Sequence, residues 1–226
     1  MGNKKTKKEY IEQYNAAIEK LGSGNSDIRI ASFHQLHCIA EGCPDDLKKD
    51  IFDHLCTYLR NMSRERSHAT IQRECPTKEC RILLDVLFRS ADRPIFRKFE
   101  ADLHGAYLIG TRLVDGYFKN ANLSEADFSN ANFLRAKLIG ANLLHTNLSG
   151  ARLWSADLSE TDLSGANLSG TNLSEANLWE AQLKGANLHD VLSIEQADFH
   201  GAKIGDKPIT EDAIPAGKGE YYADWK

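Results

Sequence analysis

The chain has 226 residues, with 28 lysines and arginines against 32 aspartates and glutamates, and its formal net charge is −4 at pH 7. This near balance predicts no strong general attraction to nucleic acid or to a membrane surface. No apolar run approaches the roughly 18 residues of a transmembrane helix, and no charged-then-apolar signal sequence opens the chain. Five cysteines, an odd number, without such a signal predict reduced thiols and a cytoplasmic protein.

Residues 1–95 are predicted to form a small α-helical N-terminal domain. Apolar residues recur there at helical spacing in four segments, separated by glycine, proline and polar stretches. The predicted helices are Lys8–Leu21, a second that begins at a cap on Ser26 or Asp27 and runs through Ala40, a third from Pro44 through Leu59, and a fourth from near Pro76 through Phe88. The polar residues 61–74 are predicted to link the last two helices.

Two C-x4-C pairs occur in this domain, Cys38 with Cys43 and Cys75 with Cys80, and His34 and His37 lie near the first pair. Such ligands could hold zinc, but structural zinc sites usually use tighter knuckles on loops. Cys38 and Cys80 fall inside predicted helices, where a free cysteine commonly packs as a small apolar side chain. We therefore expect no metal or cofactor in this domain, with a zinc site as the alternative.

The first six residues, Met1 to Thr6, fit the M-G-x-x-x-[ST] acylation pattern, and Lys7 and Lys8 follow. An acyl chain on Gly2 and a lysine cluster would be the two signals that stable membrane anchoring requires. Bacterial cytosol does not normally carry out this acylation, and lysines ahead of a helix are commonly solvated. We expect a solvated helix start, with peripheral membrane association as the alternative.

From Ala101 to Asp190 the chain repeats every five residues, eighteen times without an insertion or deletion. The centre of each pentad is leucine or phenylalanine, the residue two before it is alanine, threonine or glycine, and the one between is mostly aspartate or asparagine. This period matches neither the 3.6 of a helix nor the 2 of a strand. It fits a solenoid in which each pentad forms one short side. The centre and the small residue are predicted to face inward, and the other three outward.

This A-(D/N)-L-x-x pattern, as in Ala121-Asn122-Leu123, resembles that of the pentapeptide-repeat family. The resemblance implies a mainly β fold, a right-handed quadrilateral β-helix with four pentads per coil. The predicted helical region is similar to the one that precedes the repeats in a subset of bacterial members, through Ser26–Glu41 and Pro76–Arg81. The pattern is specific for the fold and says little about function.

The repeat slips by one residue after Leu188. The next centre in register would be Ser193, and the pattern returns one residue late at Ala197-Asp198-Phe199. We predict a bulge or short loop over 191–196, and a β-helix that spans residues 96–204. The tail, residues 205–226, is predicted to cap the open end with Tyr221, Tyr222 and Trp225. A terminus without fixed structure is the alternative.

The outward position after each centre is often serine, and the departures from serine are informative. If every fourth pentad shares a face, Val114, Leu134 and Trp154 form a vertical row, while Ile139 and Leu144 add apolar groups on other faces. Stacked apolar residues are typical of a protein-contact surface. Scattered surface hydrophobics are the alternative. We expect the N-terminal helices to pack against the first two or three coils and cover part of this row, or two copies to form a symmetric homodimer through it.

No catalytic motif accompanies the histidines or serines, and no glycine-rich phosphate loop is present. We therefore predict no enzyme activity, no catalytic or cofactor-binding residues, and a scaffold or protein–protein interaction module whose partner the sequence does not identify.

The alternative comes from the resemblance, because the family includes quinolone-resistance proteins thought to mimic DNA and bind a type II topoisomerase such as gyrase. Mimicry requires acidic charge along the rod. Residues 101–155 hold five basic and four acidic residues, and residues 156–190 hold one basic and six acidic. A basic row of Arg112, Arg135 and Arg152 on the apolar face argues against mimicry.

Overall fold

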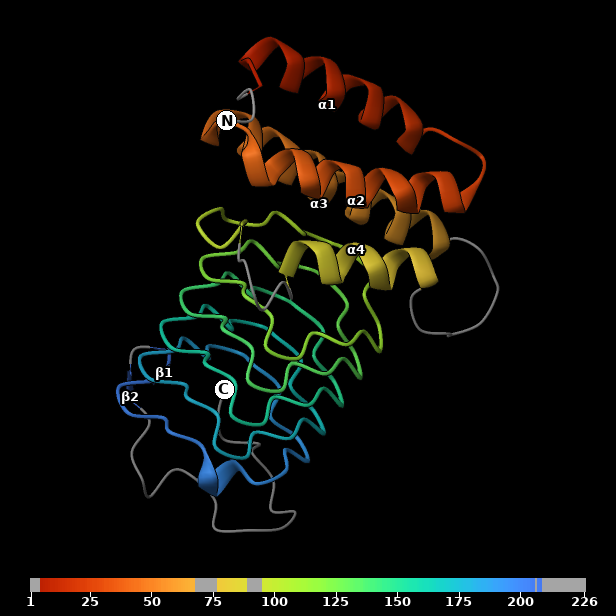
Figure 1. Cartoon of the computed structure of the whole chain (residues 1–226). Coiled ribbons are helices and arrows are strands. Elements are labelled where there is room, and N and C mark those ends of the chain that lie inside the picture. Colours follow the sequence, from red (N-terminus) through yellow and green to blue (C-terminus); the bar gives the residue numbers. More distant parts are fainter. Residues whose placement is uncertain (1–4, 68–76, 89–94, 206, 209–226) are drawn as a thin grey trace.

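The computed structural model describes residues 5–67, 77–88, 95–205 and 207–208. Helices stack at one end of a solenoid of short coils (Figure 1). The elements are α1 (Lys7–Leu21), α2 (Ser26–Gly42), α3 (Asp45–Ser67), α4 (Lys78–Phe88), a 3₁₀ turn at Ile194–Gln196, β1 (Lys203–Ile204) and β2 (Lys207–Pro208). The four predicted helices are thus confirmed.

Side-chain caps fix the starts of the first two helices. The Thr6 hydroxyl accepts from the Glu9 N–H at 3.3 Å, and the Glu9 carboxylate accepts from the Thr6 N–H at 2.6 Å. This capping box gives Thr6 a structural role. The Asn25 side chain caps α2 by accepting from the Asp27 N–H at 2.8 Å, so the predicted cap on Ser26 or Asp27 was wrong. Asn25 has the extended backbone that a cap requires.

Helix α3 is longer than predicted, because it continues to Ser67 through residues predicted to form a link. Its last turns pack against the rest of the protein: Met62 lies against the hydrophobic core and Ser63 is buried. Tertiary contact of this kind outweighs the weak signal of a polar sequence. Pro44 immediately precedes the helix, a difference of one residue from the prediction.

A partly buried ion pair joins the helices to one another. The Arg29 guanidinium on α2 donates to both carboxylate oxygens of Glu79 on α4, at 2.7 and 2.8 Å. The Tyr58 hydroxyl on α3 donates to Glu79 Oε1 at 2.9 Å. Burial, together with this bond to the carboxylate, raises the pKa of Tyr58 to about 12. Helix α1 packs against α2, and α4 packs against α2 and α3.

In the solenoid each coil pairs with the next through parallel bridges between residues 20 apart, which confirms four pentads per coil. The Leu103 N–H donates to the Asn122 carbonyl at 2.8 Å, and the Asn122 N–H donates to the Ala101 carbonyl at 2.8 Å. The pentad centres and nearly all the small residues two before them are buried, as predicted. The right-handed sense of the winding stays a prediction.

Every pentad turns its corner at its last residue, which has a positive φ in all eighteen, from Gly105 to Asp190. Arg135 (56°) and Glu160 (59°) adopt this left-handed conformation as readily as the glycines. A residue with a side chain loses about 1 kcal/mol there, and the hydrogen bonds between coils offset that cost. Gly150 has a second reason to be glycine, because a Cβ would lie 2.6 Å from Asn130 Oδ1.

Threonine and glycine occur at inward positions where a hydrogen bond or a neighbouring ring accounts for them. Thr111 is fully buried, and its hydroxyl donates to the Leu108 carbonyl at 2.8 Å. Gly116 takes the small position beside a phenylalanine centre. A Cβ at Gly116 would lie 2.6 Å from the Phe118 ring. The narrow core is therefore filled to the limit that close packing allows.

The predicted slip after Leu188 is confirmed. Bridges span 20 residues as far as Asn172–Leu192 and 21 residues from Asn177–Asp198 onward. The extra residue is taken up by Ser193, in the left-handed conformation, and by the 3₁₀ turn that follows. Ile194, only 3% exposed, is buried in the core where Ser193 could not serve. The predicted cap by Tyr221, Tyr222 and Trp225 lies outside the described residues.

The helices close the open N-terminal end of the solenoid (Figure 1). Backbone groups on the upper edge of the first coil have no coil above them, and the Tyr107 and Tyr117 N–H groups find partners in the helical region. The Tyr107 N–H donates to the Ser63 hydroxyl at 3.0 Å, and the Tyr117 N–H donates to the Phe88 carbonyl at 3.3 Å. An unpaired strand edge invites association with other chains, so these bonds protect the end of the ladder.

Stacked aromatic rings carry the hydrophobic core across this junction. The Phe88 ring, at the end of α4, lies 4.4 Å from the Phe118 ring of the first coil, centroid to centroid. Phe118 in turn contacts Phe133 in the second coil at 5.9 Å, and Phe52 on α3 lies 6.3 Å from Phe88. The expected packing of the helices on the solenoid is therefore confirmed, but the contacts described lie over the end of the first coil, not along two or three coils.

Inward and outward positions can be tested with neighbouring substitutions. Leu143→Asp places a carboxylate at a fully buried position, and should destabilise the protein by about 4 kcal/mol or more in urea unfolding. Asn142→Asp is the control, because residue 142 is exposed and an aspartate oxygen can still accept the Leu144 N–H. It should change stability by about 0.5 kcal/mol or less. Similar losses for the two variants would contradict the assignment.

The cap can be tested at single amides. Ser63→Ala removes the acceptor of the Tyr107 N–H, and should speed hydrogen exchange at that amide about tenfold. The Tyr117 amide, bonded to the Phe88 carbonyl, should exchange at its original rate. Unchanged exchange at Tyr107 would show that this bond does not protect the edge.

Candidate protein-binding surface

Because the coils repeat every 20 residues, outward side chains stack in columns on four faces. The third face carries two such columns side by side. From the upper to the lower coils, the columns are Arg112, Asn132, Arg152 and Asn172, and Val114, Leu134, Trp154 and Ser174. We call Arg112, Leu134, Arg152 and Trp154 the arginine–tryptophan face.

The predicted apolar row is graded in exposure along this face. Val114 is only 8% exposed, so it offers little surface to a further protein. Leu134 is half-buried, and Trp154 is 49% exposed. The row therefore offers one large apolar side chain to solvent, with a second beside it. Its value as a contact surface stays a prediction.

The other apolar residues do not join this row. Ile139 on the fourth face and Leu144 on the first face are half-buried. Trp179 is 36% exposed on the fourth face, and Tyr107 is 46% exposed on the second. The prediction considered only the position after each centre, and Tyr107 occupies the position before it. An aromatic residue there, in place of asparagine or aspartate, was the signal that could have identified it.

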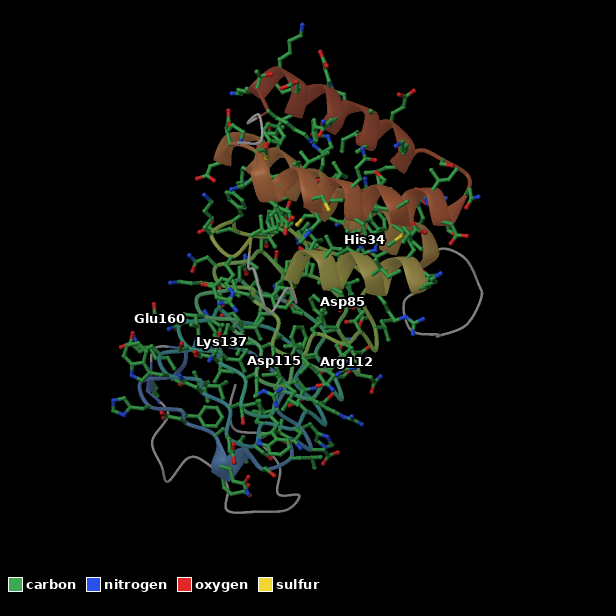
Figure 2. All side chains as sticks on the ribbon, in the orientation of Figure 1. His34, Asp85, Arg112, Asp115, Lys137 and Glu160 are labelled. Carbon is green, nitrogen blue, oxygen red and sulfur yellow. The ribbon has the colours of Figure 1, made fainter. Side chains whose placement is uncertain are left out.

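The predicted basic row is also revised. Arg135 stands in the next column, and its guanidinium donates to both carboxylate oxygens of Asp115 at 2.8 and 2.9 Å. Arg112 and Arg152 remain together in one column, and both are exposed. Figure 2 shows Arg112 and Asp115 on the coils below α4. Within the described ranges, no side chain forms a hydrogen bond or ion pair with Arg112 or Arg152.

His104 and Ser124 lie close together, although no motif in the sequence paired them. His104 Nδ1 lies 3.0 Å from the Ser124 hydroxyl, and His104 Nε2 lies 4.0 Å from Glu125 Oε2. The 20-residue spacing of His104 and Ser124 was the signal, since it stacks them on adjacent coils. Serine, histidine and a carboxylate in sequence are the members of a nucleophilic triad.

The geometry favours a structural role for this serine. The Ser124 hydroxyl donates to Asn122 Oδ1 at 2.7 Å. The same bond occurs between Ser159 and Asp157, at 2.8 Å, and in a further coil. It is therefore part of the repeat itself. The Glu125 oxygen at 4.0 Å is also too distant for a hydrogen bond that would orient an imidazole.

An ion pair lies beside this cluster, at the junction with α3. The Asp102 carboxylate accepts from Arg60 Nη1 and, at 3.2 Å, from the His104 N–H. Burial opposes ionisation of Asp102, but these donors outweigh it and hold the pKa of the carboxyl below its ordinary value. Arg64 donates to the His104 carbonyl at 2.5 Å and to the Gly105 carbonyl at 2.9 Å. These contacts attach α3 to the first coil.

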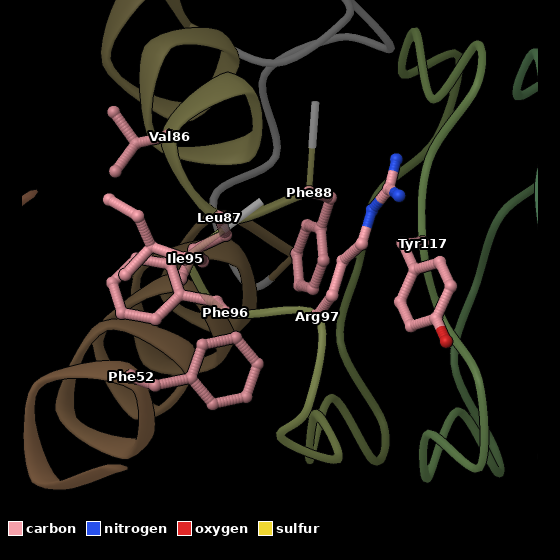
Figure 3. Close-up of a pocket in the computed structure, with 8 residues that line it drawn as sticks. All are labelled: Phe52, Val86, Leu87, Phe88, Ile95, Phe96, Arg97 and Tyr117. Carbon is pink, nitrogen blue, oxygen red and sulfur yellow. The ribbon is translucent and has the colours of Figure 1, made fainter. Parts of the chain in front are cut away.

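Of the two cavities described beside the helices, one is small and the other is bordered by charges that compensate each other. The one in Figure 3, about 20 Å³, lies between α3, α4 and the first coil. Its lining residues are Phe52, Val86, Leu87, Phe88, Ile95, Phe96, Arg97 and Tyr117. That volume suffices for about one water molecule. An open hollow of about 490 Å³ is bordered by Arg29 and Glu79, whose charges compensate each other.

The cysteines of the zinc alternative are only partly described. Cys43 and Cys80 are buried, Cys38 is exposed, and Cys75 lies outside the described residues. Burial raises the pKa of the Cys43 thiol. Among the residues that the structure describes, no three His, Cys, Asp or Glu side chains are grouped to hold a metal ion. In the same ranges, no helix has the length and apolar character needed to cross a bilayer.

Acid should weaken the Asp102 contact. Because its native pKa is lowered, the ionised carboxylate contributes stability above its ordinary pKa of about 3.9 and loses it as pH falls through the native value. Asp102→Asn should therefore lower the free energy of unfolding measured in urea at pH 7, by about 1 kcal/mol or less for this half-exposed pair. The difference from wild type should shrink below about pH 4. Asp162→Asn, in the same column without a described cationic partner, should show a smaller difference at both pH values. A difference for Asp102→Asn that grows on acidification would contradict this assignment.

The repeat region is similar to known proteins. The family model for pentapeptide repeats matches in eight copies, over residues 101–133, 117–154 and 155–190. Rfr23 from the cyanobacterium Cyanothece 51142 is 27% identical, over 46% of this chain and 88% of its own, with a TM-score of 0.28. A pentapeptide repeat protein from the Arabidopsis thaliana thylakoid lumen is 32% identical, over 49% and 70%, with a TM-score of 0.18.

The plasmid-mediated fluoroquinolone resistance protein QnrB1 is 23% identical, with a TM-score of 0.30. The match covers 47% of this chain and 66% of QnrB1, just under two thirds of its length. A search of the curated proteins returned no match. Through its residues 101–190, the chain belongs to the pentapeptide-repeat family, and a helical region precedes its repeats.

Proposed function

We propose that this protein is a non-enzymatic scaffold of the bacterial cytoplasm that binds a partner protein on the outer faces of its β-helix. The observation that carries the proposal is Trp154, 49% exposed on an outer face beside Arg152. Tryptophan and arginine are the residue types that most often dominate the binding energy of protein interfaces. An exposed tryptophan otherwise costs solubility without contributing to the core.

The backbone beneath Trp154 is held on both sides, which favours binding. The Arg135 N–H donates to the Trp154 carbonyl at 3.0 Å, and the Leu153 N–H donates to the Asn172 carbonyl at 2.9 Å. A surface already ordered before association loses little conformational entropy when a partner arrives. Half-buried Leu134 extends the apolar area on the same face, and Ile139 and Leu144 could contribute on adjoining faces.

Site-specific crosslinking in the native host tests the scaffold proposal. A photoreactive phenylalanine analogue replaces Trp154 in one variant and Trp179, on the fourth face, in the matched control. We expect a saturable adduct with one partner protein from position 154, and none from position 179. An adduct of twice the chain's mass would instead indicate a homodimer through this face. Absence of any adduct from every outer face would contradict the scaffold.

A DNA-mimicking regulator of a type II topoisomerase is the second candidate. Its support is the exposed acidic residues of the lower coils, Glu160, Glu175 and Glu180. The exposed Arg112 and Arg152 on the upper coils oppose it, because a mimic must present negative charge along its length. A gyrase supercoiling assay with the purified protein separates the two proposals. Inhibition of supercoiling, or protection of gyrase from a quinolone, would favour the mimic over the scaffold.

A further inference from the structure

We propose that the arginine–tryptophan face binds an acidic amphipathic α-helix of a partner protein, lying along the solenoid axis. This inference rests on the proposed scaffold function and specifies the chemistry of the partner. It combines the charge, the apolar surface and the spacing of one face.

The charge of this face is positive and uncompensated within the described residues. Arg135 is neutralised by Asp115, and on the fourth face Lys137 lies 3.6 Å from the Asp157 carboxylate. Arg112 and Arg152 have no such partner there, and both are exposed. Two free guanidinium groups in a chain of net charge −4 form a local site for carboxylates, which they can bind in bidentate fashion.

Apolar surface lies directly beside this charge. Leu134 and Trp154 stand in the adjoining column, two positions along the chain from Asn132 and Arg152. The face therefore presents an arginine stripe next to an apolar stripe, both parallel to the solenoid axis. A complementary partner carries carboxylates next to apolar side chains along one line, which is the arrangement of an amphipathic segment.

The spacing selects a helix over a strand. Arg112 and Arg152 are two coils apart, or about 9.6 Å at the usual separation of paired strands. In a helix, residues seven apart lie on one face and are separated by about 10.5 Å. In a strand, residues on one face are separated by about 6.7 or 13 Å. Acidic residues seven apart in a helix can thus reach both arginines.

The face also has room for a helix. Across the corner from the arginine column, the last residues of the neighbouring pentads are Gly110, Asn130, Gly150 and Gly170. Asn130, which is short, is therefore the one side chain that projects from this column. Between the two arginines stands Asn132, which is short and half-buried because its Oδ1 accepts the Leu134 N–H at 3.1 Å. A partner helix can therefore approach the arginine stripe closely.

The test uses a fluorescein-labelled, alanine-rich peptide of about 18 residues, long enough to be helical alone. It carries glutamate at every seventh position beside a stripe of leucines. Binding to the full-length chain is measured by fluorescence anisotropy. We expect saturable binding that weakens at least about tenfold, or 1.4 kcal/mol, in Arg112→Glu/Arg152→Glu. We expect a comparable loss in Trp154→Ser, which copies Ser174 of the same column.

The matched control is Lys184→Glu/Lys203→Glu, which makes the same change in net charge at exposed residues on the first face. It should change the dissociation constant less than about twofold, since a screened surface charge contributes little at a distance. Thermal melts of all three variants verify folding. Equal weakening in both double variants, or equal binding of a peptide with the same composition in scrambled order, would overturn the inference.

The two proposals fail in different ways. If the peptide does not bind, but position 154 crosslinks a partner through a segment that is not an acidic helix, the scaffold stands and this inference is wrong. If no outer face crosslinks a partner, the scaffold itself fails, whatever the peptide does. Binding that persists in Arg112→Glu/Arg152→Glu would show that the peptide occupies another surface.

Discussion

The 20-residue register between coils is the constraint on which the rest of this structure depends. Because backbone hydrogen bonds hold each coil on the next in this register, like positions stack, and an outward side chain lies next to the same position in the coils above and below. On the second face this produces an amide ladder in which Asp127, Asn147, Asn167 and Asn187 bond in succession at 3.0–3.2 Å. One extra residue shifts everything beyond it, and the chain absorbs that residue in a single tight turn at the last coil.

An open-ended ladder also creates the need for the helical region. The first coil exposes backbone donors on one edge and aromatic core on its end, and both are costly to leave unpartnered. The helices supply a hydroxyl and a carbonyl acceptor to the edge, and Phe88 stacks on Phe118 of the core. The benefit is mutual, since short helices gain most of their stability from tertiary packing.

Departures from the repeat differ in what they reveal. Ser124 and His104 look like a catalytic pair, yet the serine makes a hydrogen bond that recurs in other coils, so the repeat explains it. Arg112, Arg152 and Trp154 occupy positions where asparagine and serine satisfy the fold in neighbouring coils. The fold therefore requires neither the charge of the two arginines nor the size of the tryptophan at these positions. That surplus is the reason to assign them to binding.

The sequence by itself determined the solenoid: its inward positions, the slip after Leu188 and, through the family resemblance of its repeat, its coil length. These follow from a local period in which every pentad packs on others like itself. Only the tertiary structure decided what depends on segments distant in the chain. Helix α3 packs on the first coil and continues through residues predicted as a linker. Val114 is buried, and Asp115 forms an ion pair with Arg135 of the next coil. The repeat pattern predicts whether a side chain faces inward or outward. Its exposure and its ion pairs depend on neighbours from other parts of the chain, which the pattern does not contain.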